Sequence, residues 1–589
     1  MRPRSESARP GQTMSPLGAV PLLRGRRPSR RLLLQGSGAL GALSALAALS
    51  ACDGDSPAPT GPTGPAPSTA PPLPDVGWHS VDRADVPEGG TLRLRVPRLP
   101  ENWNPHHIDG AVAELDLLRG PLGGGAELTA QGTGPDPLYI ERAHVTASQP
   151  MTVSFRYNPS AVWEDGNPIV VEDLIARWRA CNGEDPRYEA ASTAGWSQIH
   201  SIERTDDEFT GRIVFTSPFA DWMAVIHPDV PAAVTSTPQA FTEAHRATPT
   251  PSRGPFRIDA VDEAAGTVTM VRNERWWGPP PRLERIEVSV LGSEDAAGAL
   301  AAGGLHALEV TTAEVLGQVD GRDGVEMRRV SGTSWTHLTL TVAGPQQHLA
   351  DPLVREAIAR GLDRESLASA ALEPLGAPVT VLDSVVHLPG QPGYEDSFAG
   401  LSFDPEAAAA LLDEAGWALD DGRRLREGRP LTLSLVVPAD APALAARAAL
   451  IQEQVSQLGI EVELREVPAA SFFSEHLAGG DFDLTTFAWT ATRFPGLSTA
   501  GIAYPLESPQ NYTGMADERI GPVVEQMTAA LDSQERTRLA NELSSIIAQT
   551  FTVIPLFVMP QVWAVREGVV NLGPSSVQRV DWTAVGLRA

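Results

Sequence analysis

The chain contains no lysine, so all 46 of its basic residues are arginines. This absence excludes a lysine Schiff base and a lysine-containing phosphate-binding loop. Cysteine is almost absent as well, and Cys52 and Cys181 allow at most one disulfide. Basic residues are outnumbered by acidic ones, and the formal charge of −27 argues against a nucleic-acid partner, because phosphate binding needs a concentrated basic surface.

Catalytic signatures are also missing from the sequence. It has no H-E-x-x-H zinc motif, no G-x-S-x-G turn and no paired C-x-x-C. The glycine run at residues 123–125 is followed by Ala126 and Glu127, with no lysine, serine or threonine to hold phosphate and magnesium, so we interpret it as a loop. We therefore expect a protein that is not an enzyme and holds no cofactor, with a secreted hydrolase as the competing hypothesis.

The first 51 residues have the pattern of an export signal. Residues 1–31 hold eight arginines and one acid, and a low-charge stretch rich in Leu, Ala, Gly and Ser follows from Leu32 to Ala51. Polar and glycine residues at 35–38 interrupt this stretch, which makes it a poor permanent membrane span. The run at residues 29–35, Ser-Arg-Arg-Leu-Leu-Leu-Gln, resembles a twin-arginine signal, and the general secretion route is the alternative.

Cys52 is the predicted lipidation site. Leu49-Ser50-Ala51-Cys52 looks like a bacterial lipobox, in which the cysteine becomes the first residue of the mature protein. Residues 52–76 are dominated by Pro, Gly, Ser and Thr, and such a segment cannot bury enough apolar surface to fold. We expect a tethered protein, exported and lipid-anchored on the outer face of the cytoplasmic membrane. Cys181 is then left as a single thiol, which we interpret as buried.

The body of the chain alternates strand and helix signals, which predicts mixed α/β layers. Residues 91–96 and 286–290 alternate apolar and polar side chains, as half-buried strands do. A helix around residues 444–458 is followed by a similar strand at 460–465. An aspartate caps a helix, and a proline in the first turn loses no hydrogen bond. Such helix starts occur at Asp351-Pro352, at Asp404-Pro405 and, without the proline, at Asp532.

Several segments of the body resemble, in order, the motifs of one protein family, the extracellular solute-binding proteins of the peptide and nickel importers (family 5). The resemblance covers roughly residues 89–580. The segments are Trp163–Pro168 (W-x-D-G-x-P) with Val171-Glu172-Asp173, Gly254–Arg257, Arg272–Gly278, Val354–Ala359 with Asp363-Arg364, Phe403–Trp417, Gln452–Glu466, Phe482–Leu484 and Asn511–Gly514. Most of these are turns and helix caps, so we expect Trp163, Asp165, Gly166 and Asp404 to hold the fold rather than a ligand.

The resemblance implies an α/β fold of the two-lobed periplasmic-binding-protein type (type II, cluster C), with an enlarged first lobe. The expected organisation is an export signal at 1–51, a tether at 52–76, a first lobe with an extra subdomain at 77–330, a second lobe at 331–552 and a return to the first lobe at 553–589. Such lobes close around a ligand by hinge motion.

The resemblance also implies a ligand pocket between the lobes. Its candidate residues are Trp335, Trp489, Thr490, Thr492 and Arg493 on one side, and the loop residues Trp103, Asp109 and Gly110 on the other. For each of them, a place in the core or on the surface is the alternative. His106 and His107 invite a metal site, but adjacent side chains on a strand point to opposite sides, so none is expected.

The peptide-binding relatives hold the ligand ammonium with an aspartate shortly after a tryptophan, and here Thr492 takes that place. The arginine that grips the carboxylate in dipeptide-specific relatives has no clear counterpart at residues 438–441. A longer peptide held by its backbone, or a non-peptide solute, therefore stays open.

The resemblance implies a monomeric substrate-binding lipoprotein of an ABC importer that captures a small solute, an oligopeptide by preference. Its partners would be the solute, the ABC permease and ATPase subunits, and the membrane through the lipid anchor, with no nucleic acid. A peptide-binding sensor or chaperone-like lipoprotein is the alternative.

Overall fold

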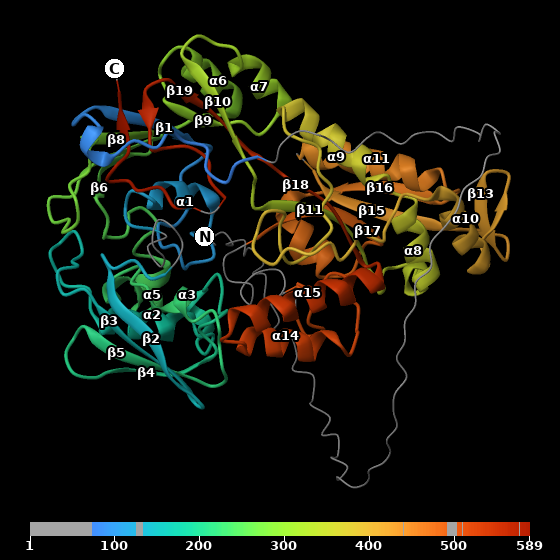
Figure 1. The fold of residues 1–589 in the computed structure, drawn as a ribbon, viewed down its shortest axis with the longest axis horizontal. Coiled ribbons are helices and arrows are strands. Elements are labelled where there is room, and N and C mark those ends of the chain that lie inside the picture. Colours follow the sequence, from blue (N-terminus) through green and yellow to red (C-terminus); the bar gives the residue numbers. More distant parts are fainter. Residues whose placement is uncertain are drawn as a thin grey trace, which may run out of the picture. The chain divides into compact units, whose positions relative to one another are not determined.

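The computed structural model describes residues 73–124, 134–439, 441–491, 503–508, 510–576 and 578–588. In these residues the chain folds into two lobes that are joined by two crossing segments (Figure 1). All elements described below belong to one compact unit of the chain, Pro67–Ala589. The predicted export signal, Cys52, Thr492 and Arg493 lie outside the described residues.

Outside its extra subdomain, the described part of the first lobe contains a four-stranded sheet, a three-stranded sheet and a two-stranded pair. On β1 the apolar side chains of Leu92, Leu94 and Val96 are buried, as their alternation with arginines predicts, and β1 pairs in parallel with β8. The strand orders are β1 (Thr91–Val96), β8 (Arg285–Val290), β7 (Thr267–Arg272), β6 (Phe256–Asp262), and β10 (Val325–Val330), β19 (Gln561–Arg566), β9 (Ala307–Glu309), with a short pair β20 (Val569–Val570) and β21 (Gly586–Leu587). The helices are α1 (Ala113–Arg119), α6 (Ser293–Ala301), α7 (Ala313–Val319) and the 3-10 turn η1 (Arg83–Asp85).

An extra subdomain with its own core enlarges the first lobe. The Trp163 indole donates a hydrogen bond to Asp173 Oδ2 over 3.2 Å, and Gly166 has a φ of +90°, so this motif shapes a turn as predicted. Cys181 is a free, buried thiol, and its burial raises its pKa to about 12. The elements are the antiparallel sheet β2 (Ile140–Ser148), β3 (Met151–Tyr157), β5 (Thr210–Phe215), β4 (Ile199–Arg204), the helices α2 (Val171–Cys181), α3 (Met223–Ile226), α4 (Ala232–Thr235), α5 (Pro238–Thr242) and the turn η2 (Pro186–Tyr188).

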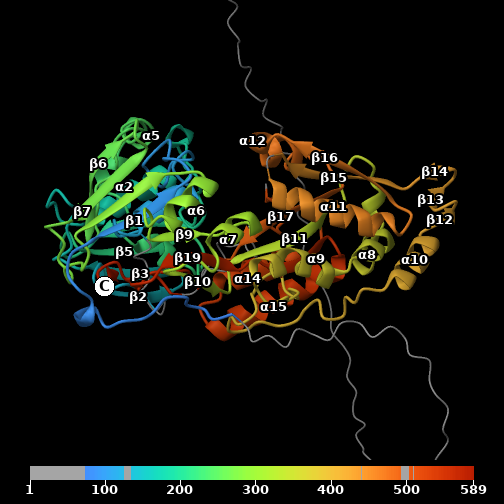
Figure 2. The same ribbon diagram turned by 90° about the horizontal axis from the view of Figure 1, so that it is seen from above.

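The second lobe is built on a five-stranded mixed sheet, against which helices α9 and α11 pack (Figure 2). The strand order is β16 (Glu461–Val467), β15 (Thr432–Pro438), β17 (Leu484–Thr490), β11 (Ser334–Leu340), β18 (Val553–Val558), and β12 (Ala418–Asp420), β13 (Arg423–Arg426) and β14 (Arg429–Pro430) form a small sheet. The helices are α8 (Pro352–Arg360), α9 (Arg364–Leu372), α10 (Pro405–Glu414), α11 (Pro442–Ser456), α12 (Ala469–Ser471), α14 (Ile520–Ala529), α15 (Ser533–Thr550), the turns η3 (His348–Ala350) and η4 (Glu373–Leu375), and the π-helix η5 (Phe472–Leu477).

The predicted helix starts are confirmed. The Asp351 carboxylate accepts a hydrogen bond from the Leu353 amide over 3.0 Å at the start of α8, and Asp404 accepts one from the Ala407 amide over 2.9 Å at the start of α10. Asp532 caps α15 in the same way, through the Glu535 amide at 2.8 Å. Each carboxylate satisfies a backbone donor that the first helical turn leaves unpaired.

Two expected domain boundaries are displaced by a few residues: the one between the second lobe and the return to the first lobe, and the one between the tether and the first lobe. Strand β18 pairs with β11, so residues 553–558 lie in the second-lobe sheet and the chain returns to the first lobe only after Val558. Residues 73–76, expected in the tether, are seated on the folded body: the Pro74 carbonyl accepts a hydrogen bond from the Ser331 amide and the Asp75 carbonyl accepts one from the Ser576 amide. Composition predicted a tether here, but backbone hydrogen bonds form regardless of side chains.

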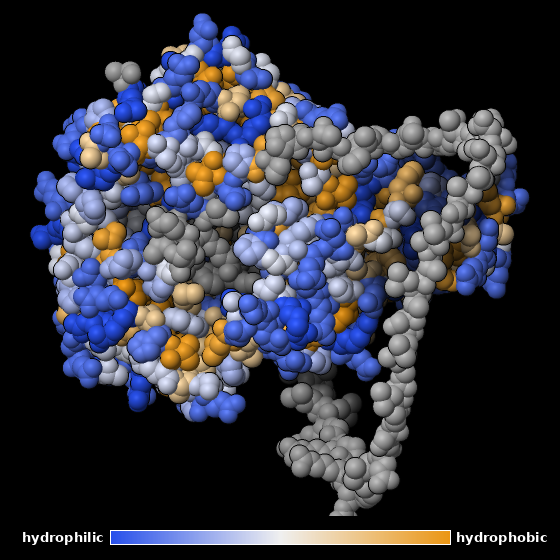
Figure 3. Space-filling view, viewed as in Figure 1, coloured by the Kyte–Doolittle hydropathy of each residue, from blue (hydrophilic) through white to orange (hydrophobic). Residues whose placement is uncertain are grey.

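The surface of the described residues agrees with the composition. On the face seen in Figure 3, hydrophilic residues cover most of the surface and hydrophobic residues appear as separate patches. None of the helices in the described ranges is both long enough and apolar enough to cross a membrane.

Candidate ligand-binding site

The two lobes are connected where β10 runs into β11 and where β18 runs into β19. These crossing segments touch: the Met559 amide donates a hydrogen bond to the Ser334 carbonyl over 2.8 Å, and a Cβ added at Gly332 would lie 1.8 Å from the Met559 carbonyl oxygen. Only glycine permits this approach. The end of β17 joins the same place through the Ala491 amide, which donates to the Thr333 carbonyl over 2.8 Å. The crossing segments are therefore bordered by the predicted site residues at the end of β17.

Trp335 and Trp489 are brought together by the sheet. They face each other in the register of β11 and β17, so their side chains leave the same face. Trp335 is only 2% exposed and belongs to the second-lobe core, whereas Trp489 is half-buried and Thr490 is exposed. In this structure Trp489 and Thr490 are accessible to a solute and Trp335 is not; their contact with a ligand stays a prediction.

Trp489 belongs to a cluster of aromatic rings, here called the aromatic face, which consists of His337, Phe473, Phe487, Trp489 and Tyr512. Phe487 lies at its centre, with ring centroids 4.4 Å from His337 and 5.2 Å from Trp489, both edge to face. Trp489 and Tyr512 are nearly parallel, 6.2 Å apart at 10°. Phe473 is 46% exposed. The cluster combines a packed base with accessible rings at its edge.

His337, a member of the aromatic face, and Arg447 on helix α11 are buried nitrogen groups of the second lobe. His337 is fully buried, and desolvation, helped by the positive charge of Arg447, lowers its pKa to about 3, so the ring is neutral at physiological pH. Desolvation also lowers the pKa of Arg447 to about 10. The Arg447 guanidinium donates through Nε to Thr486 Oγ1 over 2.8 Å and lies 6.0 Å from the centre of the Phe557 ring. None of the five residues of the aromatic face carries a carboxylate.

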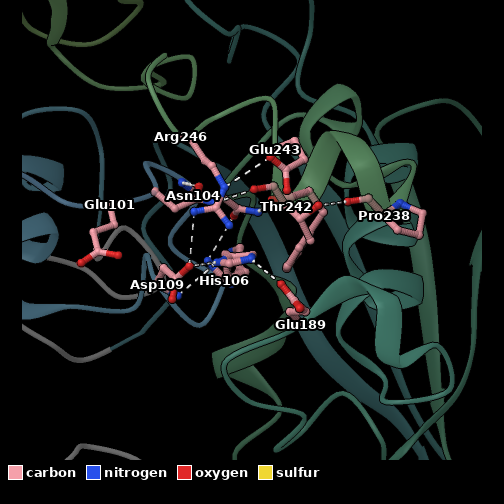
Figure 4. Close-up of polar contacts among 12 residues, drawn as sticks. Glu101, Asn104, His106, Asp109, Glu189, Pro238, Thr242, Glu243 and Arg246 are labelled. Carbon is pink, nitrogen blue, oxygen red and sulfur yellow. Dashed lines mark hydrogen bonds and ion pairs between the residues drawn. The ribbon is translucent and has the colours of Figure 1, made fainter. Parts of the chain in front are cut away.

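The first-lobe loop places its candidate residues differently from the prediction. Trp103 is 3% exposed and packs in the first-lobe core, so it forms no pocket wall in this structure. A Cβ at Gly110 would lie 1.9 Å from the Asn104 carbonyl oxygen, so this glycine is required by the loop itself. Asp109 is partly exposed but already lies 3.6 Å from Arg246 and 3.7 Å from His107 Nδ1 (Figure 4).

The adjacent histidines of this loop point to different carboxylates. His106 Nε2 lies 2.9 Å from Asp229 Oδ2, and His107 Nε2 lies 3.2 Å from Glu189 Oε2. Within the ranges that the structure describes, no three His, Cys, Asp or Glu side chains gather in a way that could hold a metal ion.

Asp229 is the centre of a buried ionic cluster that the sequence did not reveal. Its carboxylate is 3% exposed and lies 2.5 Å from Arg119 Nη2, 3.2 Å from Arg253 Nη2 and 3.8 Å from Arg177 Nη1. Burial alone would raise its pKa, but Arg119, His106 and Arg253 outweigh burial and hold the pKa well below the ordinary value. Three arginines around one carboxylate make this part of the first lobe strongly ionic.

The family of the chain follows from its relatives. The model of the bacterial extracellular solute-binding proteins, family 5 Middle, matches residues 135–505. The oligopeptide-binding protein OppA of Mycobacterium tuberculosis (strain H37Rv) is 33% identical over 510 residues, which are 86% of each chain. The chain belongs to family 5 of the bacterial extracellular solute-binding proteins, as its motifs indicate.

Solved structures show the same two-lobed fold. The periplasmic EDTA-binding protein EppA superposes with a TM-score of 0.78 at 24% identity, covering 88% of this chain and 100% of that one. The oligopeptide-binding protein AppA from Bacillus subtilis, in complex with a nonapeptide, has a TM-score of 0.69 at 16% identity, and the match covers 86% of this chain and 100% of AppA. The predicted fold class is confirmed, and the protein is a solute-binding protein of the ABC importer family, whose relatives bind substrates rather than transform them.

Proposed function

We propose that this protein captures oligopeptides by closure of its two lobes and delivers them to ABC permease and ATPase subunits. The observation that carries the proposal is the aromatic face, because it borders the crossing segments and exposes the rings of Phe473, Trp489 and Tyr512 in part. Aromatic rings contact side chains of many kinds and so suit a ligand of varied sequence. The name of the 33% identical relative, an oligopeptide-binding protein, supports the same solute class.

Binding of a peptide backbone fits the charges around this face. Neither His337 in its neutral form nor Arg447 supplies a negative charge, and the position where the peptide-binding relatives carry an ammonium-binding aspartate is Thr492. A ligand whose ammonium is enclosed without a partner pays a large desolvation cost. We therefore expect a peptide long enough for its amino terminus to stay in water.

The proposal is tested on the purified full-length protein by native mass spectrometry, followed by thermal unfolding with peptides of increasing length. We expect a co-purified peptide, stoichiometric binding, and stabilisation that grows with ligand concentration, as linkage requires. Mass spectrometry of the peptide after incubation must show it unchanged. Hydrolysis of the peptide would instead support a secreted hydrolase, and peptide binding without genes for permeases and ATPases beside this one would support a sensor or chaperone-like lipoprotein.

The membrane anchor is a separate part of the proposal. Lipidation of Cys52 would hold the exported protein on the outer face of the cytoplasmic membrane. Cys52→Ala is expected to abolish lipid labelling and to release the protein or leave it as a precursor. Cys181→Ala is the matched control, because this thiol is buried and should leave labelling unchanged. Full membrane retention and labelling of Cys52→Ala would overturn the assignment.

A further inference from the structure

A cavity of about 380 Å³ lies within the first lobe, where the C-terminal end of β1 meets β9 and β19. These three strands lie together in both views of the fold (Figures 1 and 2). The volume falls in the range of small-molecule sites, roughly 300–1,000 Å³. The lining includes apolar side chains and two charged ones: Leu94, Arg95, Leu117, Leu308, Glu309 and Trp563. No second-lobe residue is needed to form it.

The two charged residues that line the cavity, Arg95 and Glu309, form no ion pair with each other. Glu309 and Trp563 are cross-strand partners in β9 and β19, so they project from the same face. Arg95 reaches the cavity from β1, where its Nη1 donates to the Leu291 carbonyl over 3.3 Å. Both residues line the same cavity, but the nitrogen atoms of Arg95 lie more than 4.0 Å from the carboxylate oxygens of Glu309, which is too far for an ion pair.

The surroundings of both groups favour a charged partner. Desolvation raises the pKa of Glu309, although the positive charge of Arg95 opposes this shift. Desolvation also lowers the pKa of Arg95, although the negative charge of Glu309 opposes that shift. Although its carboxylate is partly desolvated by its surroundings, the Glu309 residue as a whole is exposed, so a ligand can reach the carboxylate from solvent. A single anion would meet repulsion from Glu309, and a single cation would meet repulsion from Arg95. A molecule that carries one charge of each sign satisfies both.

From this arrangement we propose that the first-lobe cavity binds a free α-amino acid with an apolar side chain. The Arg95 guanidinium would hold its carboxylate, the Glu309 carboxylate would hold its ammonium, and Leu117 and Trp563 would contact the side chain. This site goes beyond the proposed function, since it is separate from the aromatic face and requires no closure of the lobes.

The test measures binding to the purified full-length protein by isothermal titration calorimetry with three probes: L-phenylalanine, L-phenylalanine amide and N-acetyl-L-phenylalanine. The amide lacks the carboxylate and the acetyl compound lacks the ammonium. We expect saturable binding of L-phenylalanine and a loss of about tenfold or more in affinity for each analogue, because each forfeits a charge-assisted hydrogen bond. Equal affinity for the three probes, or no saturable binding of L-phenylalanine at millimolar concentration, would overturn the proposal.

Variants locate the site. Glu309→Gln and Arg95→Gln should each weaken L-phenylalanine binding by about tenfold. Arg93→Gln is the matched control: Arg93 lies on the same strand, pairs with Glu287 at 3.5 Å and does not line the cavity. Unchanged binding in both cavity variants would place the amino acid elsewhere and refute the assignment. If a variant misfolds, the comparison of the three probes on the unaltered protein still decides. Peptide binding is measured in parallel, so that loss of one activity without the other separates this proposal from the proposed function.

Discussion

The two lobes present opposite chemistry. In the first lobe, Asp229 is buried among Arg119, Arg177 and Arg253, so the structure there depends on compensated charge. In the second lobe, the aromatic face is built from rings around Phe487, and even its histidine is neutral. Charged side chains bind their partners through hydrogen bonds of fixed geometry, whereas aromatic side chains can pack against many kinds of group. If the aromatic face binds the solute as proposed, the adaptable contacts lie on the second lobe and the fixed ionic contacts on the first.

The largest effect on stability is expected from removing the charge of Asp229 in the ionic cluster of the first lobe. Asp229→Asn leaves the buried arginines without their carboxylate and should lower the free energy of unfolding by about 3–5 kcal/mol. Chemical denaturation measures this difference. The control Glu203→Gln removes an exposed partner of Arg212 in the same subdomain and should cost less than about 1 kcal/mol. Equal costs for the two variants would show that the Asp229 cluster adds no stability beyond that of a surface pair.

An intermediate effect is expected from pH on the aromatic side. The pKa of His337 is about 3 in the folded protein, below the ordinary value near 6.5. Between pH 3 and pH 6.5 this histidine is therefore protonated in the unfolded chain but neutral in the folded one. Stability from this group is complete above pH 6.5 and falls with decreasing pH by up to about 1.4 kcal/mol per unit. Denaturation between pH 7 and 5 should show a flatter profile for His337→Phe than for the unaltered protein. Identical slopes would contradict a buried neutral histidine.

The smallest effect concerns the ligand. Trp489→Ala removes an accessible ring of the aromatic face and should weaken peptide binding by about tenfold, since aromatic contacts contribute roughly 1 kcal/mol beyond their area. Phe403→Ala, which removes another exposed ring of the second lobe, is the control and should leave the affinity unchanged. Calorimetry compares both with the unaltered protein. An affinity that falls equally in both variants would separate the aromatic face from binding.

Local signals made much of the fold predictable. Aspartates at helix starts and alternating strands such as β1 act through neighbours in sequence, and the motifs around Trp163 and Asp404 define the family. The site was predictable only in part. Trp489 was predicted because the family resemblance marks its strand; it is partly exposed in the structure, and its contact with a ligand stays a prediction. Trp103 and Trp335 were also predicted to line a pocket, but the packing of their lobes buries them.

Tertiary contacts explain what the sequence did not reveal. The Asp229 cluster joins side chains from residues 106 to 253, and no local pattern links them. Phe473 and Tyr512 reach Phe487 only through the folding of the second lobe. His337 was not predicted either, although its position two residues after Trp335 on one strand is a signal that could have placed both side chains on the same face.

Residues 73–76 are bonded to the folded body, and their position determines where the chain enters it. Pro74 is bonded to Ser331, next to the crossing segment at Gly332, and Asp75 is bonded to Ser576 on the first-lobe side. The first described residues of the chain therefore lie beside the crossing segments, with one hydrogen bond on each side of them. If the two lobes close as proposed, the start of the folded body is placed where such a motion displaces the backbone least.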